Sequence, residues 1–500
     1  MITSSLKIML WDNEIGRLSW DEKRGVSYFE YSKEFLRGKI DAFPLIASIT
    51  SPASRLPIWG DTETRIYRRL PPFLADSLPD AWGNEVFECW RRGSGLRNKE
   101  ITPLDVLSFI GKRGMGALEF QPESAGTRHT EVLHLQNLTS LAHRIFRERE
   151  KVKILPDESL TMQSLIAVGT SAGGRQPKAI VAINEATGEI RSGQIAGQRG
   201  CRYYILKFGD KERSSAELEM TYSEMASAAG IDMMPCRLIE VGGERHFITL
   251  RFDRCGERKL HMQTLAALYP EAESYEQLLM VCRKLRLPES AQEEVFRRMV
   301  FNVIANNTDD HNKNFSFLMD EQGRWRLSPA YDMTYIFNTG GYQPETEHCL
   351  TIREKRSALS KADALAIAKD NGIRKAEAII KKVGEAVSMF RTFAAKNGVK
   401  PRWTDAVEST LRENLEGWEM APYTHLTEAE IDGILYSDIH VERTYKGNFH
   451  LYATTNGKQQ KFVIGKNKAD YVLIEQVGVT NLSHDQLITM VRTHLHKDGK

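Results

Sequence analysis

Acidic and amide side chains gather in one short stretch of the sequence, in an order that suits chemistry on phosphate groups. Asp309 is followed five residues later by Asn314, and a second carboxylate, Asp332, follows after an apolar run and a turn. In phosphoryl transfer, one carboxylate orients the attacking hydroxyl group, while an amide and a later carboxylate hold magnesium beside the nucleotide phosphates. These residues therefore allow a phosphoryl-transfer site, although a loop of turn-forming Asp and Asn side chains fits the same spacing.

The elements around this stretch are predicted from the spacing of apolar residues. Apolar side chains recur on one face of a helix over 295–304, and a short strand is predicted at 315–319. A turn at 320–323 leads into a second short strand at 325–327. We therefore expect a buried helix to lead into the polar loop, and a hairpin to bring Asp332 back to it.

A loop rich in Gly, Ser and Thr joins an apolar segment to a predicted strand within 164–183. The backbone N–H groups of such a loop could cradle phosphate groups. The loop lacks both the Gly-Lys-Ser/Thr order of a Walker motif and a GxGxxG pattern, so a glycine-rich hairpin without a ligand remains an alternative. The loop residues are Gly169, Thr170, Ser171, Ala172 and Gly173.

A single lysine stands in the apolar, strand-like run 201–208. Such a lysine is ordinarily an edge residue whose stem packs on the sheet while its charge reaches water. A kinase, however, needs a strand lysine that contacts the nucleotide phosphates and is held by a carboxylate on a helix. Lys207 suits that role, and the next predicted helix, 217–229, carries three glutamates.

Two runs carry a resemblance to a known family: Thr-Asp-x-His-x-Lys-Asn-Phe-Ser at 308–316 and Pro-x-Tyr-Asp at 329–332. They resemble the catalytic segment of the HipA-family serine/threonine kinases, the toxin components of bacterial toxin–antitoxin pairs. The resemblance implies that Asp309 is the catalytic base and that Asn314 and Asp332 bind Mg²⁺.

The same resemblance extends to the residues expected to bind ATP. In the family, the glycine-rich loop covers the ATP phosphates and carries a serine that the enzyme phosphorylates on itself, and the matching residue here is Ser171. Lys207 and Glu219 match the strand lysine and the helix glutamate of the family. The other two glutamates of the helix, Glu217 and Glu224, are expected to face solvent.

Two further sets of residues take their roles from this resemblance. The segment Arg251, Phe252 and Asp253 resembles the family's hinge, where backbone groups contact the adenine of ATP. His311 and Lys313 lie within the catalytic loop, where Lys313 could stabilise the phosphoryl group during transfer.

The composition is ordinary for a soluble globular protein, with 27% charged and 41% hydrophobic residues. The net charge of +2 is too small to favour nucleic-acid binding over the whole surface. The six cysteines include no Cys-x-x-Cys pair, which argues against a zinc site and favours reduced thiols. No run of about 18 apolar residues and no signal-like N-terminus occurs, so we expect a cytoplasmic protein without a membrane partner.

The expected fold is α+β, a two-lobed protein-kinase-like fold with additions at both ends. A HipA-type N-terminal α/β subdomain, to which no chemistry is assigned, is expected at 1–125. An N-lobe-like region with the phosphate loop and hinge follows at 126–255, and a helical C-lobe with the catalytic loop at 256–422. An α+β appendage of unknown role, ending in a helix at 484–496, is expected at 423–500.

The order of these motifs implies a kinase that transfers the γ-phosphoryl group of ATP to Ser or Thr of a protein substrate. In the family, such targets include translation factors, and a helix-turn-helix antitoxin relieves the growth arrest, with DNA bound only indirectly through the antitoxin complex. A catalytically quiet co-repressor and a small-molecule kinase remain alternatives. A metal-dependent nuclease could use Asp309, Asp310 and His311, but it would leave the strand lysine unexplained.

Overall fold

The computed structural model describes residues 3–93, 100–123, 134–148, 176–193, 197–256, 258–337, 347–418, 428–431, 434–443, 449–455, 458–466 and 471–477. Two predicted features lie outside these residues, namely the glycine-rich loop at 169–173, with Ser171, and the final helix at 484–496.

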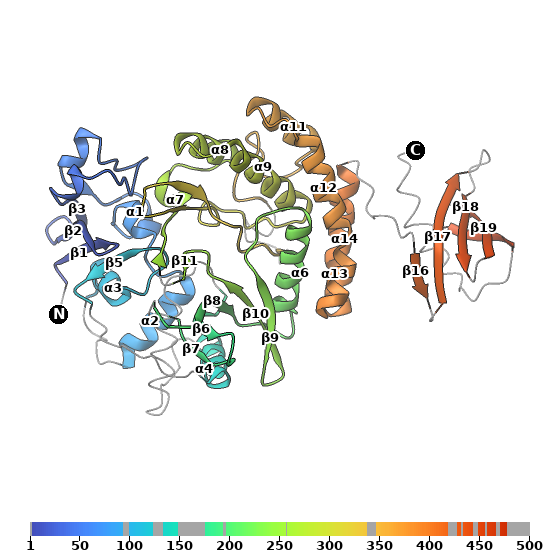
Figure 1. The fold of residues 1–500 in the computed structure, drawn as a ribbon, viewed down its shortest axis with the longest axis horizontal. Coiled ribbons are helices and arrows are strands. Elements are labelled where there is room, and N and C mark those ends of the chain that lie inside the picture. Colours follow the sequence, from blue (N-terminus) through green and yellow to red (C-terminus); the bar gives the residue numbers. More distant parts are fainter. Residues whose placement is uncertain are drawn as a thin grey trace.

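The first sheet is antiparallel and opens the chain, with strand order β4-β3-β2-β1-β5 (Figure 1). Buried and more exposed side chains alternate along β1, as expected for a sheet with one covered face. Helix α3 packs on β1, β2 and β5. The elements are β1 (Ser5–Leu10), β2 (Asn13–Asp21), β3 (Val26–Tyr31), β4 (Ile58–Trp59), α1 (Pro72–Ala75), α2 (Ala81–Gly93), α3 (Pro103–Ile110) and β5 (Leu118–Gln121), with 3-10 turns η1 (Phe35–Arg37), η2 (Pro52–Arg55) and η3 (Arg65–Tyr67).

The second sheet has the order β7-β6-β8-β10-β9 and carries helix α6 against β9 and β10. In the antiparallel pairing of β6 with β8, Lys178 lies directly opposite Lys207. Residues at paired positions point to the same face of a sheet, so both lysines are presented on one side. The elements are α4 (Leu135–Glu148), β6 (Lys178–Asn184), β7 (Ile190–Ser192), β8 (Cys201–Lys207), α6 (Ser215–Ala228), β9 (Cys236–Val241) and β10 (Glu244–Leu250).

The third part is mainly helical and contains the polar stretch. The predicted helix and hairpin around it are confirmed, because α9 ends at Ile304 and β14 pairs with β15. A three-stranded sheet, β13-β14-β15, lies beside the helices. The elements are β11 (Arg254–Cys255), β12 (Arg258–Lys259), β13 (His261–Thr264), α7 (Leu265–Leu268), α8 (Tyr275–Lys284), α9 (Glu289–Ile304), β14 (Ser316–Met319), β15 (Trp325–Leu327), α11 (Lys361–Asp370), α12 (Ala376–Ser388), α13 (Phe390–Asn397) and α14 (Pro401–Gly417).

Two apolar clusters form most of the interior. One joins the first sheet and its helices to the inner faces of β6, β8 and β10, so that Phe29 and Leu107 belong to the same cluster as Ile180, Leu206 and Ile248. The other joins the helical part to α6. The second sheet therefore packs on one core, and α6 on the other.

The last described segment is a five-stranded antiparallel sheet, which Figure 1 shows apart from the rest of the described chain, beyond α14. The strands expected after residue 422 are thus present. They are β16 (Glu428–Ile431), β17 (Ile434–Arg443), β18 (Phe449–Thr455), β19 (Lys458–Lys466) and β20 (Tyr471–Val477).

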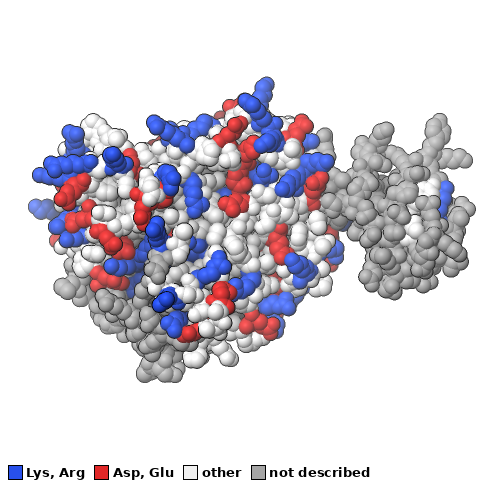
Figure 2. Space-filling view, viewed as in Figure 1, with Lys and Arg blue, Asp and Glu red and all other residues white. Residues whose placement is uncertain are grey.

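The surface agrees with the small net charge. Figure 2 shows Lys and Arg side chains interspersed with Asp and Glu over the described residues of the face in view. Among the helices that the structure describes, none has the length and apolar character needed to cross a membrane.

Candidate active site

A cavity of about 500 Å³ lies where the second sheet, α6 and the loop after α9 meet. This volume is within the range of small-molecule and cofactor sites. The predicted site residues that line it are Lys207, Glu219, Phe252, His311, Lys313 and Asp332.

Three charged side chains form the centre of the cavity. The ammonium group of Lys207, at the end of β8, forms ion pairs with the carboxylates of Glu219 on α6 and of Asp332. Lys207 is 8% exposed and Glu219 is 5% exposed. Asp332 has a backbone φ of +54°, a left-handed conformation that non-glycine residues seldom adopt and that often marks a functional site. The structure thus joins a strand lysine, a helix glutamate and the later aspartate in one contact.

The three groups influence one another's protonation. Burial would lower the pKa of Lys207, but the carboxylates of Asp332 and Glu219 outweigh this effect and raise the pKa. Burial would raise the pKa of Asp332, but Lys207 and Lys178 reverse this effect and lower it. For Glu219, burial raises the pKa and Lys207 offsets only part of that rise. At neutral pH, Lys207 is therefore charged and Asp332 is ionised, as phosphate and cation binding require.

The polar loop after α9 holds the remaining predicted catalytic residues. Asn314 donates a hydrogen bond of 2.7 Å from Nδ2 to the backbone oxygen of Asp309, which closes the loop. His311 Nε2 lies 3.9 Å from Asp309 Oδ1, and the Asp309 side chain is 38% exposed. His311 and Lys313 line the cavity, with Asp309 and Asn314 on either side of them along the same loop. The Asp309 side chain is thus partly exposed, but neither Asp309 nor Asn314 is among the residues that line the cavity.

Asp310, the neighbour of Asp309, supports the loop from inside the protein. Its buried carboxylate accepts hydrogen bonds from the Tyr275 hydroxyl at 2.6 Å, from His348 Nδ1 at 2.9 Å and from the Cys349 backbone N–H at 2.8 Å. The Leu350 backbone N–H is a fourth donor, at 3.4 Å. A buried carboxylate that four donors engage is not open to a metal ion, and this argues against the nuclease alternative.

Asp332, at the cavity, and Asn314, on the loop beside it, would supply oxygen donors for a magnesium ion that arrives with a nucleotide. Among the described residues, no group of three or more His, Cys, Asp and Glu side chains is placed to hold a metal. Magnesium bound to a nucleotide needs fewer protein ligands, because phosphate oxygens and waters complete its coordination. Asn314 uses its amide nitrogen on Asp309, so its amide oxygen is the atom for a hard cation, and Asp332 supplies a carboxylate.

The predicted hinge residues divide between two environments. Phe252 lines the cavity, whereas Arg251 and Asp253 are buried in an ion pair with Nη2–Oδ2 and Nε–Oδ1 distances of 2.7 and 2.9 Å. Asp253 also accepts hydrogen bonds from Arg254 Nη1 and from the Gly116 backbone N–H, both at 2.7 Å. Arg251 and Asp253 therefore attach the predicted hinge to the N-terminal subdomain. Their backbones are also engaged within the protein, because the Arg251 N–H donates to the Tyr203 oxygen at 2.8 Å and the Asp253 oxygen accepts from the Leu260 N–H at 3.0 Å.

No chemistry was expected of the N-terminal subdomain, yet its segments 65–68 and 75–84 contribute to the cavity wall. Asp80 forms an ion pair of 3.0 Å with Lys178, the first residue of β6. Burial raises the pKa of Asp80, and Lys178 opposes this rise. Asp80 and Lys178 are 98 residues apart, so a local sequence pattern carries no signal of their contact.

The other glutamates of α6 are less exposed than expected. Glu224 accepts hydrogen bonds from Lys396 Nζ at 2.7 Å and from Asn397 Nδ2 at 3.0 Å, both on α13. Glu217 is half-buried. Of the three glutamates, Glu219 is the one that lines the cavity.

Comparison with solved structures supports the expected fold. A chain of the Shewanella oneidensis toxin–antitoxin complex of HipA, HipB and operator DNA matches with a TM-score of 0.58 and 18% identity. The match covers 83% of this chain and 97% of that chain. It confirms the α+β, two-lobed kinase-like fold.

Sequence comparisons identify the family. The HipA N-terminal domain matches residues 6–121 and the HipA-like C-terminal domain matches residues 170–390, which together make up more than half of the chain. The serine/threonine-protein kinase toxin HipA of Shewanella oneidensis is 22% identical over 361 residues, which is 67% of this chain and 76% of that protein. A relative from Sinorhizobium fredii with a provisional kinase name is 24% identical over 71% of this chain and 82% of its own length. The chain belongs to the HipA family.

Proposed function

We propose that this protein is an ATP-dependent serine/threonine-protein kinase. The observation that carries the proposal is the contact of Lys207 with both Glu219 and Asp332 at the wall of a cavity large enough for a small-molecule ligand. A kinase needs such a lysine to neutralise phosphate charge, a helix carboxylate to hold it, and a nearby aspartate for magnesium. The kinase names of its relatives agree with this assignment.

The proposed residues divide the work of phosphoryl transfer. The oxygen of a Ser or Thr hydroxyl group attacks the γ-phosphorus of ATP, the bond from that phosphorus to the bridging oxygen breaks, and ADP leaves with the electron pair. Asp309 orients the hydroxyl group and accepts its proton, while Lys207 and Lys313 face the phosphate charge. Asn314 and Asp332 would hold magnesium, which would supply neutralising charge to the phosphates.

The proposal includes control of the enzyme by modification and by a partner. Ser171 is the proposed site of autophosphorylation, in the loop with Gly169, Thr170, Ala172 and Gly173 that would cover the ATP phosphates. The complex of the Shewanella relative contains HipB and operator DNA. On that analogy, we assign to this chain a helix-turn-helix antitoxin, DNA contact through that antitoxin, and a translation factor as the protein substrate that it phosphorylates in the cytoplasm.

The test is the intact mass of the protein after incubation with ATP and magnesium, starting from unphosphorylated protein. The wild type should gain about 80 Da for each phosphate. Asp309→Asn should slow this gain by about 10²- to 10⁴-fold, because it removes the general base. Asp332→Asn should slow it by removing a magnesium ligand. Asp320→Asn is the matched control, since Asp320 lies in the exposed turn between β14 and β15.

The outcomes separate the parts of the proposal. Phosphate mapped to residues other than Ser171 would overturn the autophosphorylation site but leave the kinase. If the wild type binds ATP but phosphorylates neither itself nor any protein in an extract, the kinase assignment fails, and the co-repressor alternative is then favoured. Transfer to a small molecule alone would favour the small-molecule kinase.

A further inference from the structure

The cavity contains a second buried lysine, which lies beside Lys207. Lys178 is 1% exposed, lines the cavity and lies directly across from Lys207 in the pairing of β6 with β8. Like charges at directly opposed positions of two strands destabilise a sheet. Each buried lysine therefore needs a carboxylate that neutralises its charge, and the carboxylates of the two lysines come from different parts of the protein.

Lys207 has its carboxylates within the kinase lobes, but Lys178 is held from the N-terminal subdomain. Asp80 Oδ2 accepts a hydrogen bond of 3.0 Å from Lys178 Nζ. Two residues later, the indole N–H of Trp82 donates a hydrogen bond of 3.0 Å to the backbone oxygen of Lys178. The start of α2 thus binds Lys178 at both its side chain and its backbone.

The Asp80 side chain is also held in place by α2. Asp80 Oδ1 accepts a hydrogen bond of 2.7 Å from the backbone N–H of Gly83, in the first turn of α2. One oxygen of the carboxylate therefore caps the helix and the other binds Lys178. Trp82 is 1% exposed, so its ring is fixed by packing.

We propose that Asp80 is a positioning residue, through which the N-terminal subdomain holds Lys178 in the nucleotide cavity as a second cation facing the phosphates. This inference rests on the proposed function, since it assigns a role within the same site. Lys178 lies close enough to Asp332 and Glu219 to lower the pKa of each, so its charge acts on the same groups as that of Lys207. Two lysines on adjacent strands then present a paired positive charge, and α2 sets the position of one of them.

The test is a double-mutant cycle on the affinity for ATP with magnesium, measured by calorimetry on the full chain. Asp80→Asn keeps an oxygen to cap α2 but places an amide nitrogen beside Lys178, and the dissociation constant should rise about tenfold, equivalent to one lost charged hydrogen bond. Lys178→Met should raise it at least as much. If Asp80 acts through Lys178, the double variant should match Lys178→Met.

A matched control is Asp363→Asn, which, like Asp80→Asn, removes a carboxylate that lies at a helix N-terminus and pairs with a lysine. Asp363 caps α11 and pairs with Lys355 at 2.8 Å, away from the cavity-lining residues. Its variant should leave the dissociation constant within about twofold of the wild type, as expected for an independent site. The thermal unfolding midpoints of all variants show how much each substitution destabilises the protein, independently of nucleotide binding.

The outcomes distinguish this inference from the proposed function. Additive effects of the two substitutions, or a tighter complex in Asp80→Asn, would overturn the inference, and the second result would show that Asp80 competes with phosphate for Lys178. Both leave the kinase assignment intact. If the wild type bound no nucleotide at all, the proposed function would fail and this inference would fail with it.

Discussion

The carboxylate of Asp310 and the ring of His348 lie 2.9 Å apart in the protein interior, and this contact joins the proposed catalytic loop to the segment that follows Asp332. The Cys349 backbone N–H reaches the other oxygen of the same carboxylate. The residue next to the proposed base is thus fixed by a part of the chain almost 40 residues away. The position of Asp309 depends on this contact.

Asp310→Asn should therefore destabilise the protein. An amide offers one accepting oxygen in place of two, so at least one of the four donors loses its partner, at a cost of about 1–3 kcal/mol in the free energy of unfolding. Urea denaturation measures the change. Tyr275→Phe removes one donor and leaves the carboxylate with three others, so its effect should be smaller. Equal stability of Asp310→Asn and the wild type would contradict this account of the loop.

Glu219→Gln should reduce phosphoryl transfer through misplacement of Lys207. A displacement of a phosphate-facing group by about 1 Å can cost roughly 100-fold in rate, so kcat/KM for ATP should fall by about that factor. Glu224→Gln is the control on the same helix, because Glu224 contacts α13 and not Lys207. If both variants lose activity to the same degree, the effect comes from α6 as a whole and not from the contact with Lys207.

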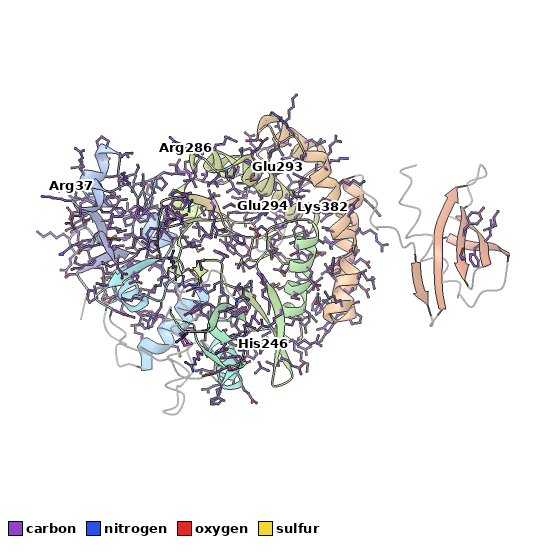
Figure 3. All side chains as sticks on the ribbon, viewed as in Figure 1. Arg37, His246, Arg286, Glu293, Glu294 and Lys382 are labelled. Atoms are coloured by element: carbon purple, nitrogen blue, oxygen red, sulfur yellow. The ribbon has the colours of Figure 1, made fainter. Side chains whose placement is uncertain are left out.

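His246 should make the protein less stable as the pH falls. The residue lies on β10 beside α4 (Figure 3), and burial is the main cause that lowers its pKa from 6.5 to about 4, although Glu244 opposes the shift. Its Nδ1 accepts a hydrogen bond of 3.1 Å from the Gly209 backbone N–H, which protonation would break.

Between about pH 6.5 and 4, the unfolded chain therefore binds more protons at this position than the folded chain. The free energy of unfolding consequently decreases as the pH is lowered through this range. Urea denaturation at pH 7 and pH 5 should show a smaller difference in His246→Gln than in the wild type. The free energy of unfolding at pH 7, where His246 is mostly neutral in both states, measures the cost of losing the ring's packing. The difference between pH 7 and pH 5 measures the effect of protonation. An unchanged difference would assign the acid sensitivity to other groups, such as the buried His261.

Asp253→Asn should loosen the attachment of the hinge to the N-terminal subdomain. Burial alone would raise the pKa of Asp253, but Arg251 and Arg254 lower it well below its usual range, so the carboxylate is ionised at neutral pH. Its neutral replacement leaves two buried guanidinium groups without their anion, which should cost about 3–5 kcal/mol.

Hydrogen exchange locates this effect, because the Gly116 N–H donates to the same carboxylate. Exchange should rise at residues 114–116 in Asp253→Asn. Asp320→Asn, at an exposed ion pair, should leave it unchanged. Faster exchange spread evenly over the first sheet, with no maximum at 114–116, would contradict a local attachment.

The elements around the catalytic loop could be predicted from the sequence because their signals are local. The apolar face of α9 and the turn between β14 and β15 depend on residues a few positions apart, and the structure contains both. Lys207 could be singled out for a similar reason, since one charge in an apolar strand is conspicuous.

The contacts between distant segments could not be predicted in this way. Asp80 meets Lys178 across 98 residues, and its sequence context shows only a turn before a helix. The burial of Arg251 and Asp253 on the subdomain side of the predicted hinge likewise involves Gly116, in the loop between α3 and β5. These residues come into contact only when distant segments pack together, and a local sequence motif carries no information on that packing.

The single apolar cluster beneath the first two sheets also has a consequence for synthesis of the protein. Residues 5–121 are synthesised before Ile180, Leu206 and Ile248, which complete the cluster that buries Phe29 and Leu107. Chains are synthesised at about 5–20 residues per second, so the apolar surface of the first sheet stays uncovered for several seconds before the rest of the cluster is made. The nascent chain thus exposes its earliest strands until β10 has been translated, and during that interval it is a natural client for chaperones.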